Sequence, residues 1–314
     1  MSVPILSVVI PTREGFEAHW LQELLKVKGD IEVILVYPPN CPKVAIADPR
    51  FRQIYAPFRG EIIQRITGLL NVTGIYTLSC NCDEYINPNI VEITQHYFNR
   101  FPDSWVMRVR IQCFKYGDKP QLEKPWINPP AIELLKVYGK SSLDKKDYRD
   151  EEDLLELPIA PLNKKIDLLI LLRGRTDQNG LHPENFDKKV WKTAMVQVTI
   201  QDIIDTMNIP GPFKYIPFWC LDRLLGLAIQ ARFFEPDKVI GHWMPLPEMI
   251  RIEDNPPQYP RHNRFYLVAE ILLLRKFSQY GYIWNLILDH LHLLPRSIAK
   301  NLMIQQQMRQ DKQK

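Results

Sequence analysis

The chain has 314 residues, of which 46% are apolar and 24% charged, and this balance excludes a chain that is disordered throughout. The net charge of +4 arises from 40 basic and 36 acidic residues, so it does not indicate a dedicated nucleic-acid binder, although local basic patches could meet phosphates or anionic lipid. Five scattered cysteines, an odd number, favour reduced thiols over a disulfide framework. We see no signal peptide and no apolar run long enough to span a membrane, and we expect a cytoplasmic protein.

The first forty residues predict a β-α-β unit. Ile5–Ile10 is a near-continuous apolar strand that stops at Pro11-Thr12, as a central parallel strand stops before an active-site loop. Phe16–Lys26 has apolar residues at helical spacing, and Ile31–Tyr37 reads as the next strand. Two strands joined by a helix favour a parallel sheet with right-handed crossovers.

The same alternation continues to residue 114. The apolar patterns predict strands at Phe51–Ala56 and Gly74–Leu78, each followed by a helix, at Gly60–Leu70 and Ile90–Phe101. Trp105–Phe114 alternates apolar and polar residues, which is typical of a half-exposed strand, so we expect an edge strand there.

Residues 117–185 differ in character, with frequent prolines and a dense mixed charge run at Asp144–Asp153. We interpret this segment as a variable, solvated insertion rather than an acidic substrate-binding element, because charge runs of mixed sign usually face water. Within it, Ile166–Leu172 is either an additional strand or a buried helical turn.

The last third returns to regular structure at Val190–Met207, with a turn at Gly211–Phe213. A helix at Leu221–Ala231, a strand fragment at Arg232–Phe234 and a strand at Val239–Trp243 come next. Residues 264–307 are helical with breaks near Gly281 and Pro295. We therefore divide the chain into an α/β domain at residues 1–250 and a C-terminal helical extension at residues 251–314.

An acidic pair, Asp83 and Glu84, follows the predicted strand at Gly74–Leu78. Ligands of open α/β sheets bind beyond the carboxyl ends of the strands, and hard cations such as Mg²⁺ and Mn²⁺ prefer carboxylate oxygens. Acids are also favoured at helix starts, so the pair could instead cap the helix from about Ile90. The stretch alone supports both interpretations.

Several motifs, taken together, resemble the family 2 glycosyltransferases, whose nucleotide-sugar-binding fold is called GT-A. The matching positions keep the order and spacing of that family over about the first 245 residues, with a poor match at residues 117–185. They are Ser7–Thr12, Glu14, Gly60, Arg65, Gly68, Gly74, Asn81–Glu84 with Pro88, Gly211 and Phe213, Asp222, and Pro236-Asp237 followed by Val239, Ile240 and His242. The resemblance implies a Rossmann-like, mainly parallel central sheet flanked by helices.

The resemblance also implies a function, which is transfer of a sugar from a nucleotide-diphosphate sugar to a hydroxyl acceptor, with inversion at the anomeric carbon. The acceptor would be a glycan or lipid-linked molecule in polysaccharide or cell-envelope glycan synthesis. A divalent metal, Mg²⁺ or Mn²⁺, would be held by Asp83, Glu84 and His242, and Asp222 would act as the base. The donor would be contacted by Pro11, Thr12, Glu14, Tyr37, Arg65, Asn81 and Asp83.

Four positions depart from the family's pattern. Tyr37 stands near the place of an acid that contacts the base; it could stack on or hydrogen-bond a base, and packing explains it equally well. Asn81 replaces the first acid of the DxD motif, Ile66 replaces an asparagine, and Cys220-Leu221-Asp222 carries one acid where there are normally two. A non-catalytic protein of the same fold with a degenerate nucleotide site is therefore the alternative. A nucleotidyltransferase is disfavoured, because the loop after the first strand lacks the glycine-rich, lysine-containing pattern.

Three further assignments have alternatives. His242 could be a core or interface histidine, and Asp222 could be an acid that caps a helix or pairs with Arg223. Tyr282–Leu294, with basic residues nearby, could form an amphipathic helix on anionic lipid, giving a peripheral membrane contact. Packing against the α/β domain or a second subunit explains the same pattern, and we favour packing.

Overall fold

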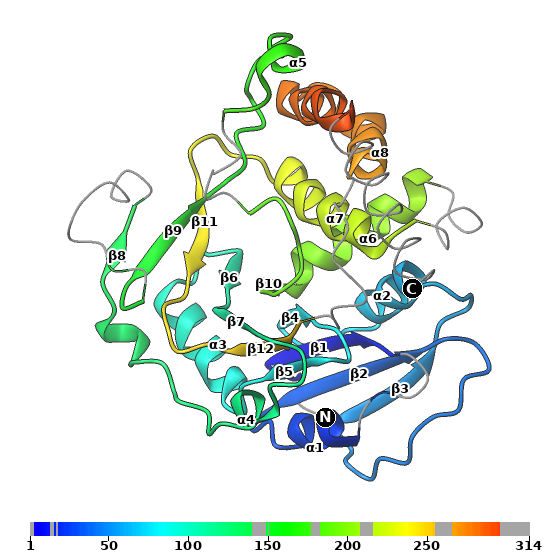
Figure 1. Ribbon diagram of the computed structural model, residues 1–314, viewed down its shortest axis with the longest axis vertical. Coiled ribbons are helices and arrows are strands. Elements are labelled where there is room, and N and C mark those ends of the chain that lie inside the picture. The colour runs from blue at the N-terminus through cyan, green and yellow to red at the C-terminus, as the bar shows by residue number, and fades with distance from the viewer. Residues whose placement is uncertain are drawn as a thin grey trace, which may run out of the picture.

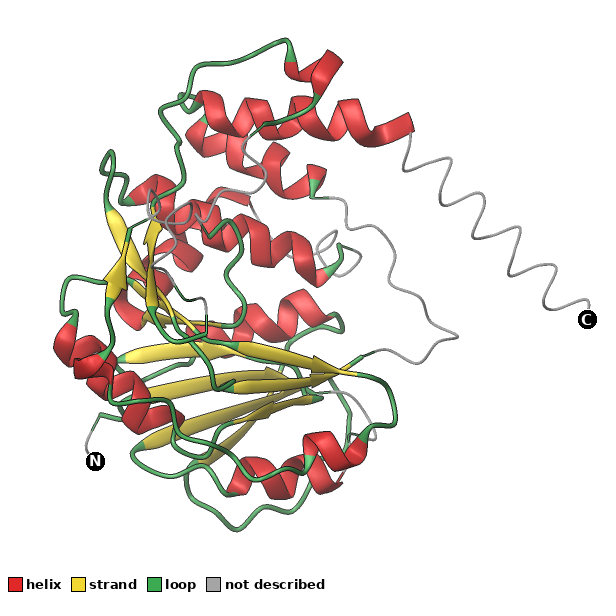
Figure 2. Ribbon diagram, turned by 60° about the vertical axis from the view of Figure 1, so that its left-hand side comes forward, coloured by secondary structure: helices red, strands yellow, loops and turns green. Residues whose placement is uncertain are grey.

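The computed structural model describes residues 3–12, 16, 18–139, 149, 151–176, 183–207, 216–254 and 266–295. Glu14, the predicted turn at Gly211–Phe213 and the end of the predicted C-terminal helices lie outside these residues. Within them the chain forms a large mixed sheet and a small second sheet, with helices on both faces (Figures 1 and 2). The predicted α/β class is confirmed.

The predicted parallel half of the sheet is confirmed element by element. β1 (Leu6–Pro11), β2 (Ile31–Tyr37), β3 (Phe51–Tyr55) and β4 (Tyr76–Ser79) lie in the order β3-β2-β1-β4, and all three pairings are parallel. The intervening helices are α1 (Ala18–Leu25), α2 (Glu61–Leu70) and α3 (Ile90–Arg100). β1 and β2 are buried along their whole length, which explains why their sequences are continuous apolar runs.

The second half of the sheet is mixed. β10 (Lys189–Lys192) pairs antiparallel with β4 and with β6 (Val106–Arg108), and β11 (Val239–Trp243) pairs parallel with β6. β9 (Leu154–Pro158) and the two-residue β8 (Val137–Tyr138) complete the order β4-β10-β6-β11-β9-β8. Part of the predicted insertion at residues 117–185 is therefore not a solvated loop, because β8 and β9 belong to the main sheet.

The single edge strand predicted at Trp105–Phe114 is wrong. β6 lies inside the main sheet, and the chain then leaves that sheet to form β7 (Ile111–Phe114). β7 belongs to a three-stranded sheet with β12 (Ile250–Glu253) and β5 (Glu84–Ile86), in the order β5-β12-β7. Glu84 is itself the first residue of β5, and Asn89 is the N-cap residue of α3, so the helix-cap interpretation of Asp83 and Glu84 is also wrong.

The main sheet has a separate apolar core on each face. Val9 of β1 and Trp191 of β10 pack with side chains of α2, α6 (Thr193–Met207) and α7 (Phe218–Arg232). Val8 of β1 and Val190 of β10 point the other way and pack with side chains of α1 and α3. This alternation lets any strand residue be assigned to the α2/α7 face or to the α1/α3 face.

The last described helices, α8 (Leu267–Phe277) and the C-terminal helix at residues 281–295, pack beyond α7 (Figure 1). Short helical segments are α4 (Lys119–Leu122), η1 (Ile132–Leu134) and α5 (Ile170–Arg173). The helix predicted at Leu221–Ala231 is confirmed within α7, whereas the predicted strand fragment at Arg232–Phe234 is wrong, since α7 runs to Arg232. In the described part of the chain no helix combines the length and apolarity that a membrane span needs.

Candidate functional site

The candidate site lies at the carboxyl edge of β1 and β4. From β1 the chain crosses to β2 and β3 and later returns to β4, on the other side of β1, so the strand order reverses between β1 and β4. In open α/β sheets the crevice at such a reversal is where ligands bind. There β1 ends at Pro11 and Thr12 leaves the sheet, and the turn at residues 80–83 leaves it from β4.

Thr12 is fixed by hydrogen bonds to the backbone around it. Its amide and its hydroxyl both donate to the carbonyl of Val36, at 2.9 and 3.0 Å. The buried amide of Gln64, on α2, donates to the carbonyls of Thr12 and Val36 at 2.7 and 2.6 Å. Gln64 therefore ties the first turn of α2 to the ends of β1 and β2, which makes this edge rigid.

Arg65 is the centre of a buried ionic network on the α2/α7 face. Its guanidinium donates to the hydroxyl of Ser79 and to Oδ1 of Asn81, and it pairs with Asp187 at 3.0 Å and with Glu61 at 3.1 Å. Arg65 is 2% exposed, and this burial by itself lowers the pKa of the guanidinium. The carboxylates of Asp187 and Glu61 outweigh burial and raise the pKa above its ordinary value. Arg65 is therefore a fixed positive charge that joins α2 to the turn after β4.

The acidic pair divides into an inward and an outward carboxylate. Glu84 is 2% exposed, and its oxygens accept from the side chain and the amide of Asn81 at 2.8 and 3.2 Å. Lys188 pairs with the same carboxylate at 3.2 Å. Asp83 is exposed. Partial burial raises the pKa of the nearby Glu61, and the charges of Asp187 and Asp83 raise it further, while Arg65 opposes the rise.

Asp222 joins the same network from α7. It lies in the second turn of that helix, and its Oδ1 accepts from the amide of Asp187 at 2.5 Å. Burial and the carboxylate of Asp187 raise the pKa of Asp222, while Lys189 opposes the rise. Pro217 is the N-cap residue of α7, and Arg223 pairs with Glu184, so the structure supports neither the capping alternative nor a pair with Arg223.

The segment immediately before β10 supplies residues that our sequence reasoning missed. Asp187 bonds Arg65, and Lys188 bonds Glu84 from a backbone with φ of 58°, a region that residues with a Cβ rarely adopt. Burial lowers the pKa of Lys189, whose amine donates to the carbonyl of Asn185 at 2.6 Å. The feature of the sequence that could have identified these residues is a cluster of charges directly before an apolar strand, at the end of the predicted insertion.

His242 does not join this network. It is 5% exposed, its Nδ1 lies 2.9 Å from the hydroxyl of Tyr97, and its ring lies 4.1 Å from that of Phe101. Its register partner Met107 packs on the α1/α3 face, whereas Arg65 and Asp222 belong to helices on the opposite face. The structure therefore supports the core-histidine interpretation, and His242 and Glu84 do not fit as metal ligands beside Asp83.

Tyr37 is placed as a packing residue. It is 1% exposed, the amide of Val44 donates to its hydroxyl at 3.4 Å, and its ring meets that of Tyr55 edge to face at 6.4 Å. A nucleotide base cannot stack on a ring that is covered in this way. The predicted residues that the structure brings to one edge are thus Pro11, Thr12, Arg65, Asn81, Asp83, Glu84 and Asp222.

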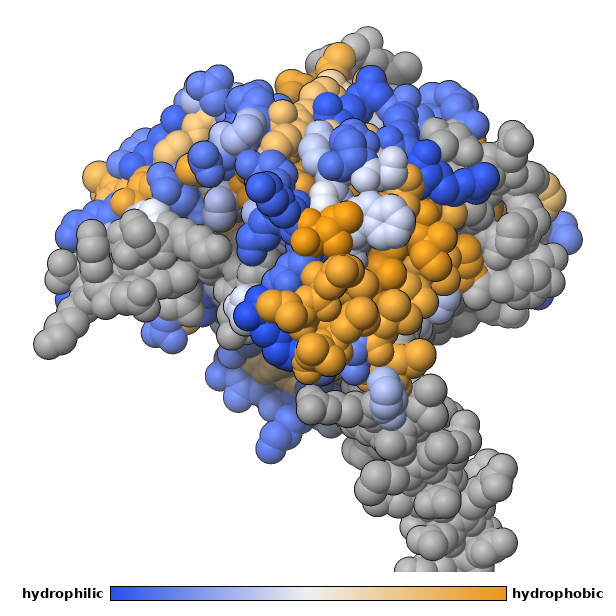
Figure 3. Space-filling model, turned by 90° about the horizontal axis from the view of Figure 1, so that it is seen from above, coloured by the Kyte–Doolittle hydropathy of each residue, from blue (hydrophilic) through white to orange (hydrophobic). Residues whose placement is uncertain are grey.

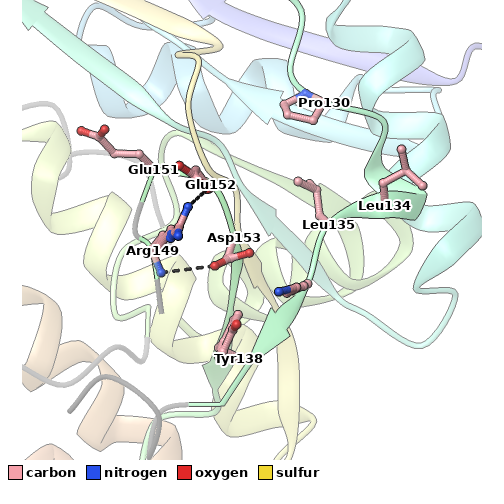
Figure 4. A pocket seen from close by; sticks show the side chains of 9 residues that line it. Pro130, Leu134, Leu135, Tyr138, Arg149, Glu151, Glu152 and Asp153 are labelled. Carbon is pink, nitrogen blue, oxygen red and sulfur yellow. Dashed lines mark hydrogen bonds and ion pairs between the residues drawn. The ribbon is translucent and has the colours of Figure 1, made fainter. Parts of the chain in front are cut away.

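Two further features of the described residues bear on where a ligand could bind. Among them, no group of three or more histidine, cysteine, aspartate or glutamate side chains is arranged to hold a metal ion. A pocket of about 690 Å³ lies at the opposite end of the strand order, beside β8 and β9 (Figure 4). It is lined by Pro130, Leu134, Leu135, Lys136, Tyr138, Arg149, Glu151, Glu152 and Asp153, none of which was predicted as a site residue.

No protein-family model matches the chain, and no curated protein matches it. Among solved structures, the chain is similar to S. aureus TarS 1-349 in complex with UDP, at 13% identity and a TM-score of 0.48, over 92% of this chain and 71% of that one. TarS 1-349 in complex with UDP-GlcNAc is matched at 12% identity and a TM-score of 0.48, over 92% of this chain and 72% of that one. A further TarS structure is matched at 13% identity and a TM-score of 0.48, over 91% of this chain and 43% of that one. These TM-scores are too low to decide a function, which must rest on the strand order and the geometry of the site.

Proposed function

We propose that the chain is a glycosyltransferase that binds a nucleoside-diphosphate sugar at the carboxyl edge of β1 and β4 and transfers the sugar to a hydroxyl group. One observation carries the proposal. Arg65, Asn81 and Asp222, singled out in distant parts of the sequence, meet in a single network at the point where the strand order reverses. Arg65 bonds Asn81 directly and is linked to Asp222 through Asp187.

Asp222 is the residue that we assign to proton removal. In the reaction, the acceptor oxygen forms a bond to the anomeric carbon while the bond from that carbon to the diphosphate breaks, and attack opposite the diphosphate inverts the configuration. A carboxylate within hydrogen-bond reach of the hydroxyl takes its proton, and the raised pKa of Asp222 makes it a stronger base than an ordinary carboxylate. The acceptor would be a glycan or lipid-linked molecule in polysaccharide or cell-envelope glycan synthesis.

Charge on the departing diphosphate must also be stabilised. Two cations of the network, Arg65 and Lys188, are held by surrounding carboxylates, and preorganised cations of this kind stabilise charge that develops in a transition state. A bound Mg²⁺ or Mn²⁺ would have Asp83 and the diphosphate oxygens as ligands, without Glu84 or His242.

A non-catalytic nucleotide-binding protein of the same fold is the second candidate. The observation in its favour is that the polar groups of the site already satisfy one another. Asn81 bridges Arg65 and Glu84, Oδ1 of Asp222 accepts from the backbone, and Tyr37 is packed rather than open to a base.

The two candidates are separated by measuring binding and transfer on the same variants. We expect the wild-type chain to bind one of a panel of nucleoside diphosphates in calorimetry and to hydrolyse or transfer the matching sugar. Asp222→Asn should keep nucleotide binding within about threefold and lose about a hundredfold or more of the transfer rate. Asp103→Asn, at an exposed position, is the matched control and should retain both.

The outcomes are distinct. If no nucleoside diphosphate binds the wild-type chain, with or without Mn²⁺, both candidates fail. Nucleotide binding without hydrolysis or transfer from any donor would establish the non-catalytic candidate. A full transfer rate in Asp222→Asn would remove Asp222 from the mechanism.

A further inference from the structure

The segment that carries α5 exposes five large apolar side chains within seven residues. They are Ile166 (53% exposed), Leu168 (68%), Leu169 (55%), Leu171 (42%) and Leu172 (79%), and we call them the α5 surface. Of the two alternatives predicted at Ile166–Leu172, the helical turn is present as α5 and its Ile170 is buried, but the turn as a whole is not. Figure 3 views the molecule from the end where α5 and the C-terminal helix lie in Figure 1, and it shows apolar residues gathered in one patch on that face. Leucines so exposed indicate a binding surface.

The C-terminal helix holds this segment in place by binding its backbone. Asn285 accepts from the amide of Asp167 at 2.8 Å and donates to the carbonyl of Lys165 at 2.9 Å. Farther along the helix, Asp289 accepts from the amide of Arg175 at 2.9 Å, and His292 lies 2.9 Å from the carbonyl of Leu171. The polar backbone is thus satisfied on the inner side.

Close packing fixes the same connection at its beginning. A Cβ on Gly281, at the start of the C-terminal helix, would lie 2.2 Å from the carbonyl oxygen of Lys164, so only glycine allows the two backbones to approach in this way. In the sequence, Leu291 and Leu294, 45% and 39% exposed, flank His292. The α5 surface is therefore presented by a built support.

The charges beside the α5 surface are mainly positive. Lys164, Lys165 and Arg173 are exposed, and the acid within the segment, Asp167, is paired with Arg173 at 2.7 Å. Two identical copies placed face to face would bring their lysines together, which disfavours a second copy of the chain as the occupant. Apolar side chains bordered by basic ones match the boundary between acyl chains and anionic headgroups.

We propose that the α5 surface docks the protein onto an anionic lipid bilayer. The leucines enter the boundary between headgroups and acyl chains, and Lys164 and Lys165 contact the headgroups. The C-terminal helix supports the contact rather than forming most of it. This inference does not depend on the proposed function, because lipid binding is measured without any nucleotide or acceptor.

Sedimentation with lipid vesicles tests the docking. The full chain should sediment with phosphatidylcholine vesicles that contain phosphatidylglycerol, bind vesicles of phosphatidylcholine alone about tenfold more weakly, and be released by salt. The double variant Leu168→Ser/Leu172→Ser should lose about tenfold or more of the binding. Lys164→Gln/Lys165→Gln should bind anionic vesicles only as weakly as it binds vesicles of phosphatidylcholine alone. Leu134→Ser, at an 81% exposed leucine on η1, is the matched control and should bind as the wild type does.

Failure of the wild-type chain to bind anionic vesicles would overturn the proposal, as would an equal loss in Leu134→Ser. Sedimentation velocity without lipid tests the alternative that a second copy of the chain covers the α5 surface. If the wild-type chain is a dimer, if Leu168→Ser/Leu172→Ser is a monomer and if neither binds vesicles, the α5 surface is a subunit interface instead. The substituted leucines are exposed, so we expect all variants to keep the wild-type circular dichroism spectrum and melting temperature.

Discussion

Replacing His242 by glutamine distinguishes a core histidine from a metal ligand. Burial, with a further contribution from Arg100, lowers the pKa of His242 from 6.5 to about 4. As the pH falls below 6.5, the unfolded chain takes up a proton on this residue, whereas the folded chain resists protonation until about pH 4. Neutral His242 therefore gives its full stabilisation above pH 6.5, and that stabilisation is lost as the pH falls toward 4.

The size of the effect is set by the same two pKa values. Between about pH 8 and about pH 5, the linkage costs the folded state about 2 kcal/mol of its free energy of unfolding. Glutamine does not titrate, and it keeps a polar group beside the hydroxyl of Tyr97, which lies 2.9 Å from Nδ1 of His242. We expect the wild-type chain to lose about 2 kcal/mol more than His242→Gln over this interval.

Urea unfolding at a series of pH values measures this difference, with His96→Gln as the control, because the His96 side chain is 48% exposed. His96→Gln should follow the wild-type pH dependence. Equal pH dependence in the wild type and His242→Gln would refute the reasoning. Loss of Mn²⁺-dependent nucleotide binding in His242→Gln, with nucleotide binding retained in His96→Gln, would restore the metal-ligand interpretation.

Two further substitutions test the sheet by urea unfolding. Glu32 accepts hydrogen bonds from the hydroxyl of Ser7 at 2.7 Å and from the amide of Thr73 at 3.0 Å. Burial opposes the charge of Glu32, but these bonds and Arg52 lower the pKa of its carboxyl group. Glu32→Gln should therefore lower the free energy of unfolding by about 2 kcal/mol at neutral pH. The difference should shrink as the pH falls below 4.5, and a constant difference would contradict it. Gly241→Ala should cost about 3 kcal/mol or more, because its Cβ would lie 1.8 Å from the carbonyl oxygen of Val106; a change below about 1 kcal/mol would contradict that packing.

The parallel half of the fold was predictable because its signal is local. β1 and β2 are covered on both faces, so burial imposes apolar residues at every position, and the turns after them are marked by proline or glycine. The helix between these strands, α1, buries Trp20, Leu21 and Leu24 on one face, and its sequence carries the matching period.

The mixed half was not predictable by the same reasoning. Arg108 and Arg110 made Trp105–Phe114 read as a half-exposed strand, yet their guanidinium groups lie 4.1 and 5.2 Å from the ring of Trp243, so these polar residues pack against an aromatic side chain. Pairing of β9 and β10 with distant strands leaves no periodic signal that identifies the partner.

The candidate site shows the same division. Asp83 and Asp222 could be singled out as candidates because motif spacing in the sequence marks them. Asp187 was missed, since its bond to Arg65 joins residues 122 positions apart and depends on how α2 and β10 pack. A charge cluster before a strand has the same local pattern whether it faces water or a buried guanidinium, so only tertiary structure separates the two.

Asn81 shows why a departure from the family's pattern is not by itself a sign of a degenerate site. Its Oδ1 accepts from Arg65 while its Nδ2 donates to Glu84 at 2.8 Å, and only a side chain with both functions can make this bridge. An aspartate could accept from Arg65, but it would face the buried Glu84 carboxylate at a separation where two acids cannot both stay ionised. The neutral residue therefore fits a turn whose inward acid is already paired with Lys188, and it leaves the exposed Asp83 as the acid of this turn that a ligand can reach.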